Sequence, residues 1–385
     1  MIRIHIAGDF TAENRTSKLL DGGRFSELLS DIEPIIKSAD FSVVNLESPV
    51  VEGNAPKLEK NGPNLKCSAK AVDALKWCGF QMAALANNHI YDYGEEGLWQ
   101  TVETLTSRGL DYVGVGKTPK DASTISYKQI KNKTVAFINA CEHEFSIVTD
   151  IHSGANPLNP IQQFYAIKEA KASADYVVVI IHGGSEMYKL PSPRMQEIYR
   201  FFIDAGADAV VNHHQHCYSG YEIYRGKPIV YGLGNFCFDD PDSIDGIWNY
   251  GYMLELQLED DNIGLKLYPY KQCGEKVGVQ LLADRDAFDE DINRLNSIIA
   301  DSQKLRQAFA DYAATQRRGR LMAFEPYGWR ILKALYWRGF LPSFLSKKKC
   351  LQMENMIGCE SHRDILLSAL KRLCLINISE PKTRT

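Results

Sequence analysis

Short apolar runs alternate with longer segments of helical period over the first 235 residues of the chain. The short runs are rich in β-branched residues, and the segments between them repeat apolar positions at the spacing of one helix face. Strands are predicted at residues 3–7, 42–46, 82–85, 112–115, 135–139, 176–181, 209–211 and 229–231. Helices are predicted at residues 24–38, 69–78, 95–108, 162–172 and 194–205. This order is typical of a layered α/β domain.

The pattern changes in two steps after these elements. Residues 251–258 and 264–270 alternate apolar and polar positions, so they are predicted to be antiparallel strands that close a sheet. From about residue 284 onward, helical period and many charges replace the strand signals. The sequence therefore predicts an α/β domain over residues 1–280 and a helical C-terminal region over residues 281–385.

Residues 326–349 are the most unusual stretch of the helical region, because aromatic and basic side chains crowd together there. Such a composition can lie flat on a membrane surface. It also suits a helix that packs on the main domain while its lysines and arginines reach along the surface to water. The sequence leaves both interpretations open, and the packed helix is the one we favour.

Composition narrows the class of protein. Of the 385 residues, 45% are hydrophobic and 24% are charged, which indicates a globular chain with a large core. The 44 basic residues nearly balance the 48 acidic ones, for a net charge of −4. No overall field therefore draws the protein to nucleic acid, and we expect no nucleic-acid partner. Any membrane contact must be local, through residues 326–349.

The cysteines and the N-terminal segment point to a reducing compartment. Nine cysteines make an odd count and include no Cys-x-x-Cys pair. The N-terminal residues alternate instead of forming the apolar stretch of a signal peptide. The most apolar internal run, residues 176–181, is far shorter than the roughly 20 residues of a spanning helix. We therefore expect a cytoplasmic protein, with residues 326–349 as its candidate membrane contact; its oligomeric state is not predicted.

Side chains that can bind metals follow one predicted strand after another. Ligands of open α/β sheets bind beyond the carboxyl ends of the strands. Asp9 follows the first strand, Glu47 the second and His182 the long apolar one. Two further strand ends carry Asn87, Asn88 and His89, and His213, His214 and His216. Five of the nine histidines lie at these ends, so chance is a poor explanation for the pattern.

Each of these residues also has a structural explanation when taken alone. Asp9 and Asn88 could cap helices or form turns, and His182 could be a hydrogen-bonded core residue. His214 and His216 are more informative, since residues two apart in an extended segment project to the same side. Together the set offers carboxylates, an amide oxygen and imidazoles, which suit Zn²⁺, Mn²⁺ or Fe better than Ca²⁺. A site for two metal ions is the leading hypothesis.

An ordered series of short motifs runs through these strand ends. The motifs are Gly8-Asp9, NLESP at residues 45–49, LANNHIYDYG at 85–94, HGGSEMY at 182–188, GADAVVNHHQH at 206–216 and YGLGNF at 231–236. In this order and spacing they resemble the signature of the capsule-synthesis CapA family, also described as poly-gamma-glutamate biosynthesis proteins. That family is a branch of the calcineurin-like metallophosphoesterases. The resemblance covers about residues 1–240 and implies the layered fold of that superfamily.

The resemblance also implies a role for each matching residue. Asp9, Glu47 and His216 would surround one metal ion. The other would be held by Glu47, which bridges the two ions, and by Asn88, His182 and His214. His89 would be a catalytic histidine above the substrate, oriented by Asp92. Glu186 and Tyr188 would either support the metal ligands or contact the substrate. Lys66 would contact an anionic substrate, although an exposed surface lysine is the simpler interpretation of Lys66.

The sequence departs from the pattern of the superfamily or of the family at several positions, and the first of these departures is also general in the family. The superfamily's first motif is usually Asp-x-His, but Thr11 stands where the histidine would be, so one ligand of the first metal is missing. Asn212 replaces the usual glycine and Gln215 the usual proline. The N-terminal membrane anchor of many members is not expected here.

The resemblance implies metal-assisted hydrolysis of a phosphoester. Two ions would hold a phosphoryl oxygen and activate a water molecule, while His89 donates a proton to the leaving oxygen. The alternative is a non-catalytic accessory protein of capsular polymer synthesis, which keeps the fold to bind polyglutamate, polysaccharide or a synthase subunit. A phosphomonoester, a phosphodiester of a surface glycan and an amide-linked polyglutamate all stay open as substrates.

Two other motifs carry weaker signals. Residues 114–118 superficially resemble a phosphate-binding loop, but their spacing does not fit that motif. Residues 141–144 follow a predicted strand and could reach the metal residues from the same side. A solvated polar loop is the interpretation that we favour for residues 141–144.

Overall fold

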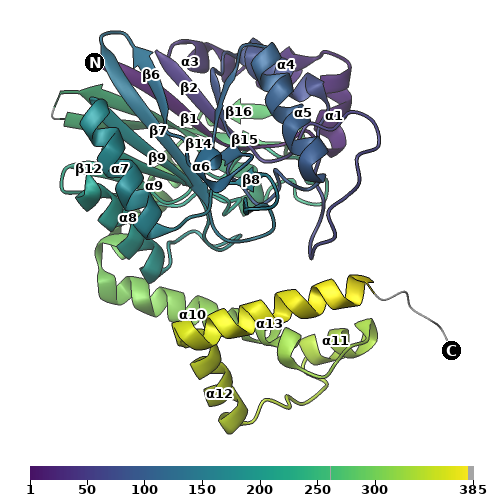
Figure 1. Ribbon diagram of the computed structural model, residues 1–385. Helices are drawn as coiled ribbons and strands as arrows, with labels where there is room; N and C mark the ends of the chain where they lie inside the picture. The colour runs from purple at the N-terminus through teal and green to yellow at the C-terminus, as the bar shows by residue number, and fades with distance from the viewer. Residues whose placement is uncertain (261, 380–385) are drawn as a thin grey trace. The chain divides into compact units, whose positions relative to one another are not determined.

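The computed structural model of the protein describes residues 1–260 and 262–379 (Figure 1). The chain divides into two compact units, Met1–Phe309 and Ala310–Thr385. The first unit contains two sheets that pack face to face and carry helices on their outer faces. This is the layered α/β architecture that the sequence predicted, and a helical C-terminal region follows it.

The first sheet has eight strands, and its parallel half provides several of the predicted metal residues. Its order is β16-β15-β14-β1-β2-β3-β4, with β13 also paired to β1. Strands β1 to β4 run parallel, whereas β14, β15 and β16 pair antiparallel at the other side. The strands are β1 (Ile2–Phe10), β2 (Phe41–Leu46), β3 (Met82–Ala84), β4 (Asp111–Val113), β13 (Asn235–Cys237), β14 (Tyr250–Glu259), β15 (Asn262–Gln272) and β16 (Val279–Leu281).

The second sheet has six strands in the order β11-β12-β10-β9-β7-β6. Its four inner strands are parallel, and β6 and β11 pair antiparallel at the edges. The strands are β6 (Ser126–Ile130), β7 (Lys133–Cys141), β9 (Tyr176–His182), β10 (Ala209–His213), β11 (Tyr221–Tyr224) and β12 (Lys227–Val230). A separate short pair joins β5 (Val115–Gly116) to β8 (Gly154–Ala155).

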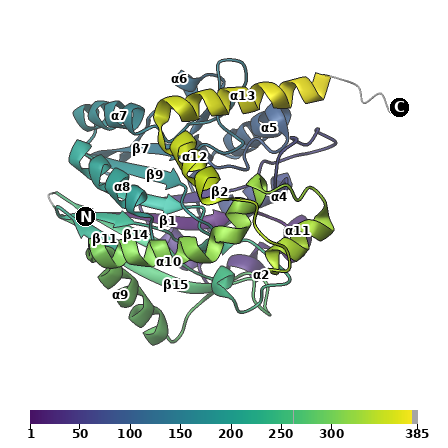
Figure 2. The same cartoon turned by 90° about the horizontal axis from the view of Figure 1, so that it is seen from below.

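The core lies between the two sheets and under the helices of the first sheet. Alternation along β2 sends Phe41 and Val43 toward the second sheet, where the Phe41 and Phe137 rings stack at 5.4 Å. Val44 and Leu46 point the other way and pack under α4 and α5. Figures 1 and 2 show α7 and α8 on one side of the sheets and α4 and α5 on the other. The helices of the first unit are α1 (Asn14–Asp21), α2 (Phe25–Leu29), α3 (Glu33–Lys37), α4 (Ala69–Cys78), α5 (Gly94–Ser107), α6 (Pro119–Ala122), α7 (Pro160–Ser173), α8 (Pro193–Ala205), η1 (Ile247–Asn249) and α9 (Asp286–Ala300).

All ten predicted strands are present, but one predicted helix is wrong. Residues 24–38 form two short helices, α2 and α3, instead of one. Pro34 lies in the first turn of α3, where its missing N–H costs nothing and its ring favours a helix start. The apolar period of residues 24–38 continues across Pro34, so the sequence pattern predicted one helix where the chain forms two. Helix α9 packs Leu295 and Ile299 into the core of the first unit. The first compact unit therefore ends at Phe309, later in the chain than residue 280, where the sequence pattern changes.

The helical C-terminal part begins with α10 (Ser302–Leu321), which continues from the first unit into the second. It is followed by η2 (Met322–Phe324), α11 (Arg330–Trp337), α12 (Lys347–Gly358) and α13 (Glu360–Ser379). Within residues 1–260 and 262–379, none of the helices combines the length and the apolar character needed to cross a membrane.

Candidate metal centre

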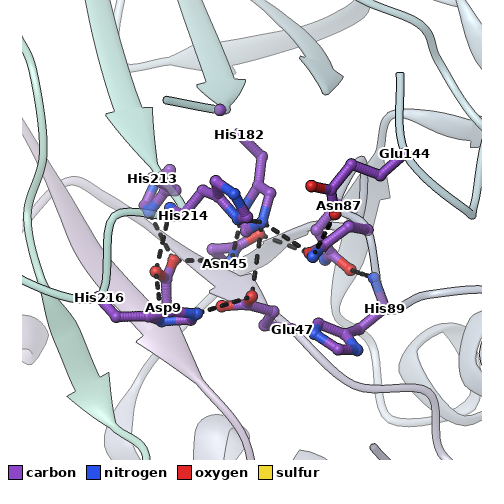
Figure 3. Close-up of polar contacts among 12 residues, drawn as sticks. Asp9, Asn45, Glu47, Asn87, His89, Glu144, His182, His213, His214 and His216 are labelled. Atoms are coloured by element: carbon purple, nitrogen blue, oxygen red, sulfur yellow. Dashed lines mark hydrogen bonds and ion pairs between the residues drawn. The ribbon is translucent and has the colours of Figure 1, made fainter. Parts of the chain in front are cut away.

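The predicted metal residues converge where strands of both sheets end. Asp9 lies near the end of β1, Glu47 directly follows β2, and His182 and His213 are the last residues of β9 and β10. Because the two sheets face each other, these side chains meet (Figure 3). All four are buried.

A glycine positions Asp9. A Cβ atom at Gly8 would lie 1.9 Å from the carbonyl oxygen of Gly234, so only glycine lets β1 and β13 approach so closely. The pairing register of β1 shifts between Ala7 and Asp9. An irregularity of this kind turns a side chain away from strict alternation. It brings Asp9 opposite Asn235 of β13.

The first group of donor atoms surrounds Nε2 of His182. Oδ1 of Asn88 lies 3.0 Å from that nitrogen, Nδ1 of His214 lies 3.1 Å from it, and Oε1 of Glu47 lies 3.5 Å from it. Donor atoms of Glu47, His182 and His214 all lie within 4.8 Å of one another. Four atoms with lone pairs thus face a common centre, as metal ligands do.

The second group shares Glu47 with the first. Asp9, Glu47 and His216 bring their donor atoms within 4.8 Å of one another. Nδ1 of His216 lies 3.6 Å from Asp9 Oδ2, and its Nε2 lies 3.7 Å from Glu47 Oε1. The two groups are the two sets that the sequence assigned by resemblance, with Glu47 between them.

The carboxylate of Glu186 also lies near the donor atoms. Its exposed side chain forms a third group with His214 and His216, again within 4.8 Å. A carboxylate at this place can bind either a metal ion or a substrate group. The resemblance implied either support of the metal ligands or substrate contact for Glu186.

The carboxylate of Glu47 is a test of whether a cation fits. Both of its oxygens are buried, and neither has a hydrogen-bond partner among the residues that the structure describes. Such a group costs on the order of several kcal/mol unless a cation or a proton compensates it. The nearby imidazoles and carboxylates are ligands that Zn²⁺, Mn²⁺ and Fe²⁺ accept. The residues therefore fit one or two such ions.

The electrostatics of the site follow from burial and crowding. Burial and the neighbouring Asp9 carboxylate raise the pKa of Glu47 well above its usual range. Burial also acts to raise the pKa of Asp9, but the hydrogen bond and charge of His213 lower it overall. The pKa of His182 is lowered by burial and by His214, and that of His214 by burial and by His216.

Several residues that no sequence pattern predicted hold the donors in place. Asn45 donates to Asp9 Oδ1 at 2.8 Å and lies 3.3 Å from Nδ1 of His182. Oδ1 of Asn235 lies 2.9 Å from Nδ1 of His216, which leaves Nε2 of that ring directed at Glu47. Such contacts fix the tautomer and orientation of a ligand. Both asparagines belong to the quoted motifs, which was the available signal.

Glu144 contacts the site through Asn88. Its Oε2 accepts from Asn88 Nδ2 at 2.8 Å, which directs Oδ1 of the asparagine toward His182. The loop at residues 141–144 therefore does reach the site. Glu144 is itself exposed, so this loop is both solvated and in contact with the site.

His89 and Asp92 form the expected pair, and Lys60 joins them. Nδ1 of His89 lies 2.7 Å from Asp92 Oδ2, and Asp92 also accepts from the backbone N–H of Leu65 at 2.7 Å. Lys60 forms an ion pair with Asp92, and its Nζ lies 3.3 Å from Nδ1 of His89. The pKa of His89 is lowered by burial, against the opposing effect of Asp92. Lys60 lies in a loop without periodicity, so no sequence pattern singled it out.

Lys66 and Tyr188 each lie near another aromatic ring. Lys66 is exposed, and its Nζ lies 5.6 Å from the centre of the Tyr93 ring. The ring of Tyr188 packs toward Phe309 at 6.3 Å. The buried basic side chain beside His89 is Lys60 rather than Lys66.

The expectation that His214 and His216 share one side of an extended segment is wrong. Strand β10 ends at His213, and the next residues are not extended. His214 has a φ of 90° and His216 a φ of 54°, in the left-handed region that residues other than glycine rarely adopt. The two rings meet through these turns of the backbone, and such strain is common at functional sites.

The comparison with known proteins identifies the family. The family model "Bacterial capsule synthesis protein PGA_cap" matches residues 3–240, and the chain belongs to this family. This confirms the resemblance of the motifs. The match contains Asp9, Glu47, His182 and His216 and ends before β14.

Curated relatives are similar over the same part of the chain. The capsule biosynthesis protein CapA of Bacillus anthracis is 33% identical over 242 residues, which are 61% of this chain and 59% of the relative. The PGA biosynthesis protein CapA of Bacillus subtilis is 33% identical over 236 residues, 60% of this chain and 62% of the relative. The chain thus matches about three fifths of each relative's length.

Solved structures give a weaker likeness. A crystal structure of a phosphatase from Mycoplasma pneumoniae aligns with a TM-score of 0.44 at 13% identity, covering 71% of this chain and 95% of that one. A hypothetical protein from Thermus thermophilus aligns with a TM-score of 0.44 at 16% identity, covering 70% of this chain and 99% of that one.

Proposed function

We propose that this protein is a metal-dependent hydrolase of phosphoesters that acts in the synthesis of a capsule or another surface polymer. The observation that supports it most is the pair of donor groups that share Glu47, whose two buried oxygens have no hydrogen-bond partner. The family and the names of its CapA relatives support the place of the reaction in capsule synthesis.

Six residues would hold two divalent transition ions in this proposal. Bound ions of this kind polarise a phosphoryl oxygen and lower the pKa of water, which supplies the nucleophile. The residues that would hold them are Asp9, Glu47, Asn88, His182, His214 and His216. Asn45 and Asn235 keep the rings of His182 and His216 aimed at the site.

His89 would move the proton of the reaction. Asp92 occupies its Nδ1 side, so Nε2 is the nitrogen that can donate a proton to a leaving oxygen. Lys60 holds Asp92 by an ion pair and adds a positive charge beside the ring. That charge favours an anionic substrate such as a phosphoester.

A second candidate is a non-catalytic accessory protein that binds a capsular polymer. The observation that favours it is Thr11, which is buried where the superfamily's motif places a histidine ligand. Its hydroxyl donates to the Ser48 hydroxyl at 2.8 Å and supplies no imidazole. The second donor group is therefore short of one ligand.

We also propose a cytoplasmic location. Eight cysteines have side chains that the structure describes; none of these eight forms a disulfide with another, and six of them are buried. Thiols in this state suit a reducing compartment.

A substrate panel tests the proposal. The full chain is assayed with p-nitrophenyl phosphate and bis(p-nitrophenyl) phosphate in the presence of Mn²⁺, Zn²⁺ or Fe²⁺. We expect turnover of at least one ester that disappears in His182→Ala. In the opposite result, the metal-loaded protein hydrolyses neither ester but binds polyglutamate or capsular polysaccharide in a binding assay. That result would favour the accessory function.

A further inference from the structure

Residues 325–344 fold around a single carboxylate in the second unit. Glu325 accepts hydrogen bonds from the Tyr336 hydroxyl at 3.1 Å and from the backbone N–H of Phe344 at 2.9 Å, and also from the Ser343 hydroxyl. The Tyr327 hydroxyl donates to the carbonyl of Pro342 at 2.5 Å. These contacts close the segment into a loop around α11.

The loop buries its tyrosines and exposes its larger apolar side chains. Tyr327 and Tyr336 are buried, and their rings lie 5.2 Å apart. Trp329, Ile331 and Phe340 are 78%, 74% and 73% exposed, and Trp337 and Phe344 are also more than half exposed. We call Trp329, Ile331, Trp337, Phe340 and Phe344 the apolar patch. Folded proteins rarely expose so many large apolar side chains in one short segment unless they contact something.

The charged side chains between Pro326 and Lys349 all have the same sign. Between Pro326 and Lys349 the chain has six basic residues and no acidic one, although its net charge is −4. All six basic residues are exposed. They are Arg330, Lys333, Arg338, Lys347, Lys348 and Lys349.

We propose that the apolar patch inserts into the headgroup region of an anionic membrane and that the basic residues contact its phosphates. Tryptophan and phenylalanine favour the boundary between water and acyl chains, and each nearby lysine or arginine adds attraction to anionic lipid. A dissolved polyanion would pair with the bases but would leave the apolar side chains in water. Helix α11 is far too short to span, so the contact is peripheral. This inference does not depend on the proposed hydrolase activity.

Sedimentation with vesicles tests the proposal with the full chain. Two kinds of vesicle are used, phosphatidylcholine alone and an equimolar mixture with phosphatidylglycerol. We expect the protein to pellet with the mixed vesicles at low salt and to be released as salt rises, because salt screens the charges. Absence of pelleting with the mixed vesicles, or equal pelleting with both kinds, would overturn the proposal.

Two variants separate the two contributions. Trp329→Ser combined with Phe340→Ser should lower the partition coefficient about tenfold or more, since it removes two inserted side chains. Changing Lys347, Lys348 and Lys349 to glutamine should lower it about a hundredfold at low salt. The matched control is Ile151→Ser with Ile161→Ser, which changes side chains of the first unit that are 92% and 70% exposed. It should pellet as the wild type does.

Other occupants would give different results. In one such result, polyglutamate binds the wild type and the Trp329→Ser, Phe340→Ser variant equally, and vesicles bind neither protein. That result would overturn the proposal and indicate that the segment binds a polyanion. In another, the wild type forms a dimer, this variant does not, and neither binds vesicles. That result would overturn the proposal and indicate that the apolar patch contacts a second copy of the chain. Thermal unfolding of the variants with a midpoint near that of the wild type confirms that the folds are intact.

Discussion

Nε2 of His182 lies 3.1 Å from Nδ1 of His214, and the same nitrogen lies 3.5 Å from an oxygen of Glu47. Two neutral imidazoles that face each other in this way can share only one proton. The carboxylate beside them accepts no hydrogen bond at either oxygen. A cation between these atoms would take one lone pair from each of them, which is why we assign the site to metal ions.

The unsatisfied carboxylate predicts an unusual stability change. Glu47→Gln removes a buried acidic group that has no hydrogen-bond partner among the described residues. The metal-free variant should therefore be more stable than the metal-free wild type, by about 1 kcal/mol or more. Added Mn²⁺ or Zn²⁺ should stabilise the wild type and leave the variant unchanged. Chemical unfolding with and without the ions measures both effects.

Glu255 provides the matched control for this change. It is also a buried carboxylate, but it accepts from the Tyr268 hydroxyl at 2.9 Å and from Gln257 at 2.6 Å. Glu255→Gln should be destabilising whether or not metal is present. A metal-free Glu47→Gln protein that is less stable than the wild type would contradict the assignment of Glu47.

Substitution of His89 should have a different effect on metal content than substitution of a metal ligand. His182→Ala or His214→Ala should reduce metal content and activity together. His89→Asn should keep metal content near the wild-type value while activity on esters with a poor leaving group falls by roughly 10²–10⁴-fold. On an activated aryl ester, whose leaving group needs no proton, the loss should be much smaller. Loss of metal from His89→Asn would show that His89 is a ligand.

Glu144 should act on metal affinity through Asn88. Glu144→Ala releases the Asn88 amide, whose oxygen then loses its fixed direction toward His182. We expect metal affinity to fall about 10- to 100-fold, the usual effect of a residue that orients a ligand. Competition with a fluorescent chelator measures it. His143→Ala, a change at the exposed neighbouring residue, should bind metal as the wild type does, and Glu144→Gln should recover part of the affinity.

Regular parts of the fold and the strand-end residues could be predicted because both follow from short-range patterns. Parallel strands bring their carboxyl ends to one edge, so Asp9, Glu47 and His182 could be expected together. Their division into two groups came only from the family resemblance. The residues that orient them depend on contacts between distant segments. Asn235 reaches His216 because β13 pairs with β1, and no local pattern announces that pairing.

Irregular backbone is the other feature that local sequence patterns do not predict. His214 and His216 occupy left-handed conformations that their residue type disfavours, so an extended strand was the natural but wrong expectation. Lys60 lies in a long loop between β2 and α4 and reaches the His89–Asp92 pair from there. Loops of this kind carry no periodicity from which contacts can be inferred.

Asp291 on α9 lies outside the metal centre, and its lowered pKa predicts that the free energy of unfolding depends on pH. Burial acts to raise its pKa, but hydrogen bonds from Lys189, Arg294 and Tyr218 lower it to about 2. A carboxylate with a lowered pKa stabilises the fold above its ordinary pKa of about 3.9 and loses that effect as pH falls toward 2. Asp291→Asn should therefore cost about 1–2 kcal/mol at neutral pH and almost nothing near pH 2. Urea unfolding across this range measures the difference.

A neighbouring residue on the same helix controls for this prediction. Asp289 pairs with Arg285 at the surface, at 2.7 Å, and its side chain is 43% exposed. Surface pairs contribute little, so Asp289→Asn should change stability by less than about 0.5 kcal/mol. An Asp291→Asn protein with the same deficit at pH 2 and pH 7 would show that packing, not charge, accounts for the effect.

Elemental analysis of the full chain, purified without chelator, tests the assignment of the metal centre most directly. We predict about one to two equivalents of Mn, Zn or Fe per chain, since two donor groups share Glu47. The content should fall sharply in Glu47→Gln and stay near the wild-type value in His89→Asn. Protein that holds no metal after incubation with Mn²⁺, Zn²⁺ and Fe²⁺ and removal of the excess would contradict the assignment.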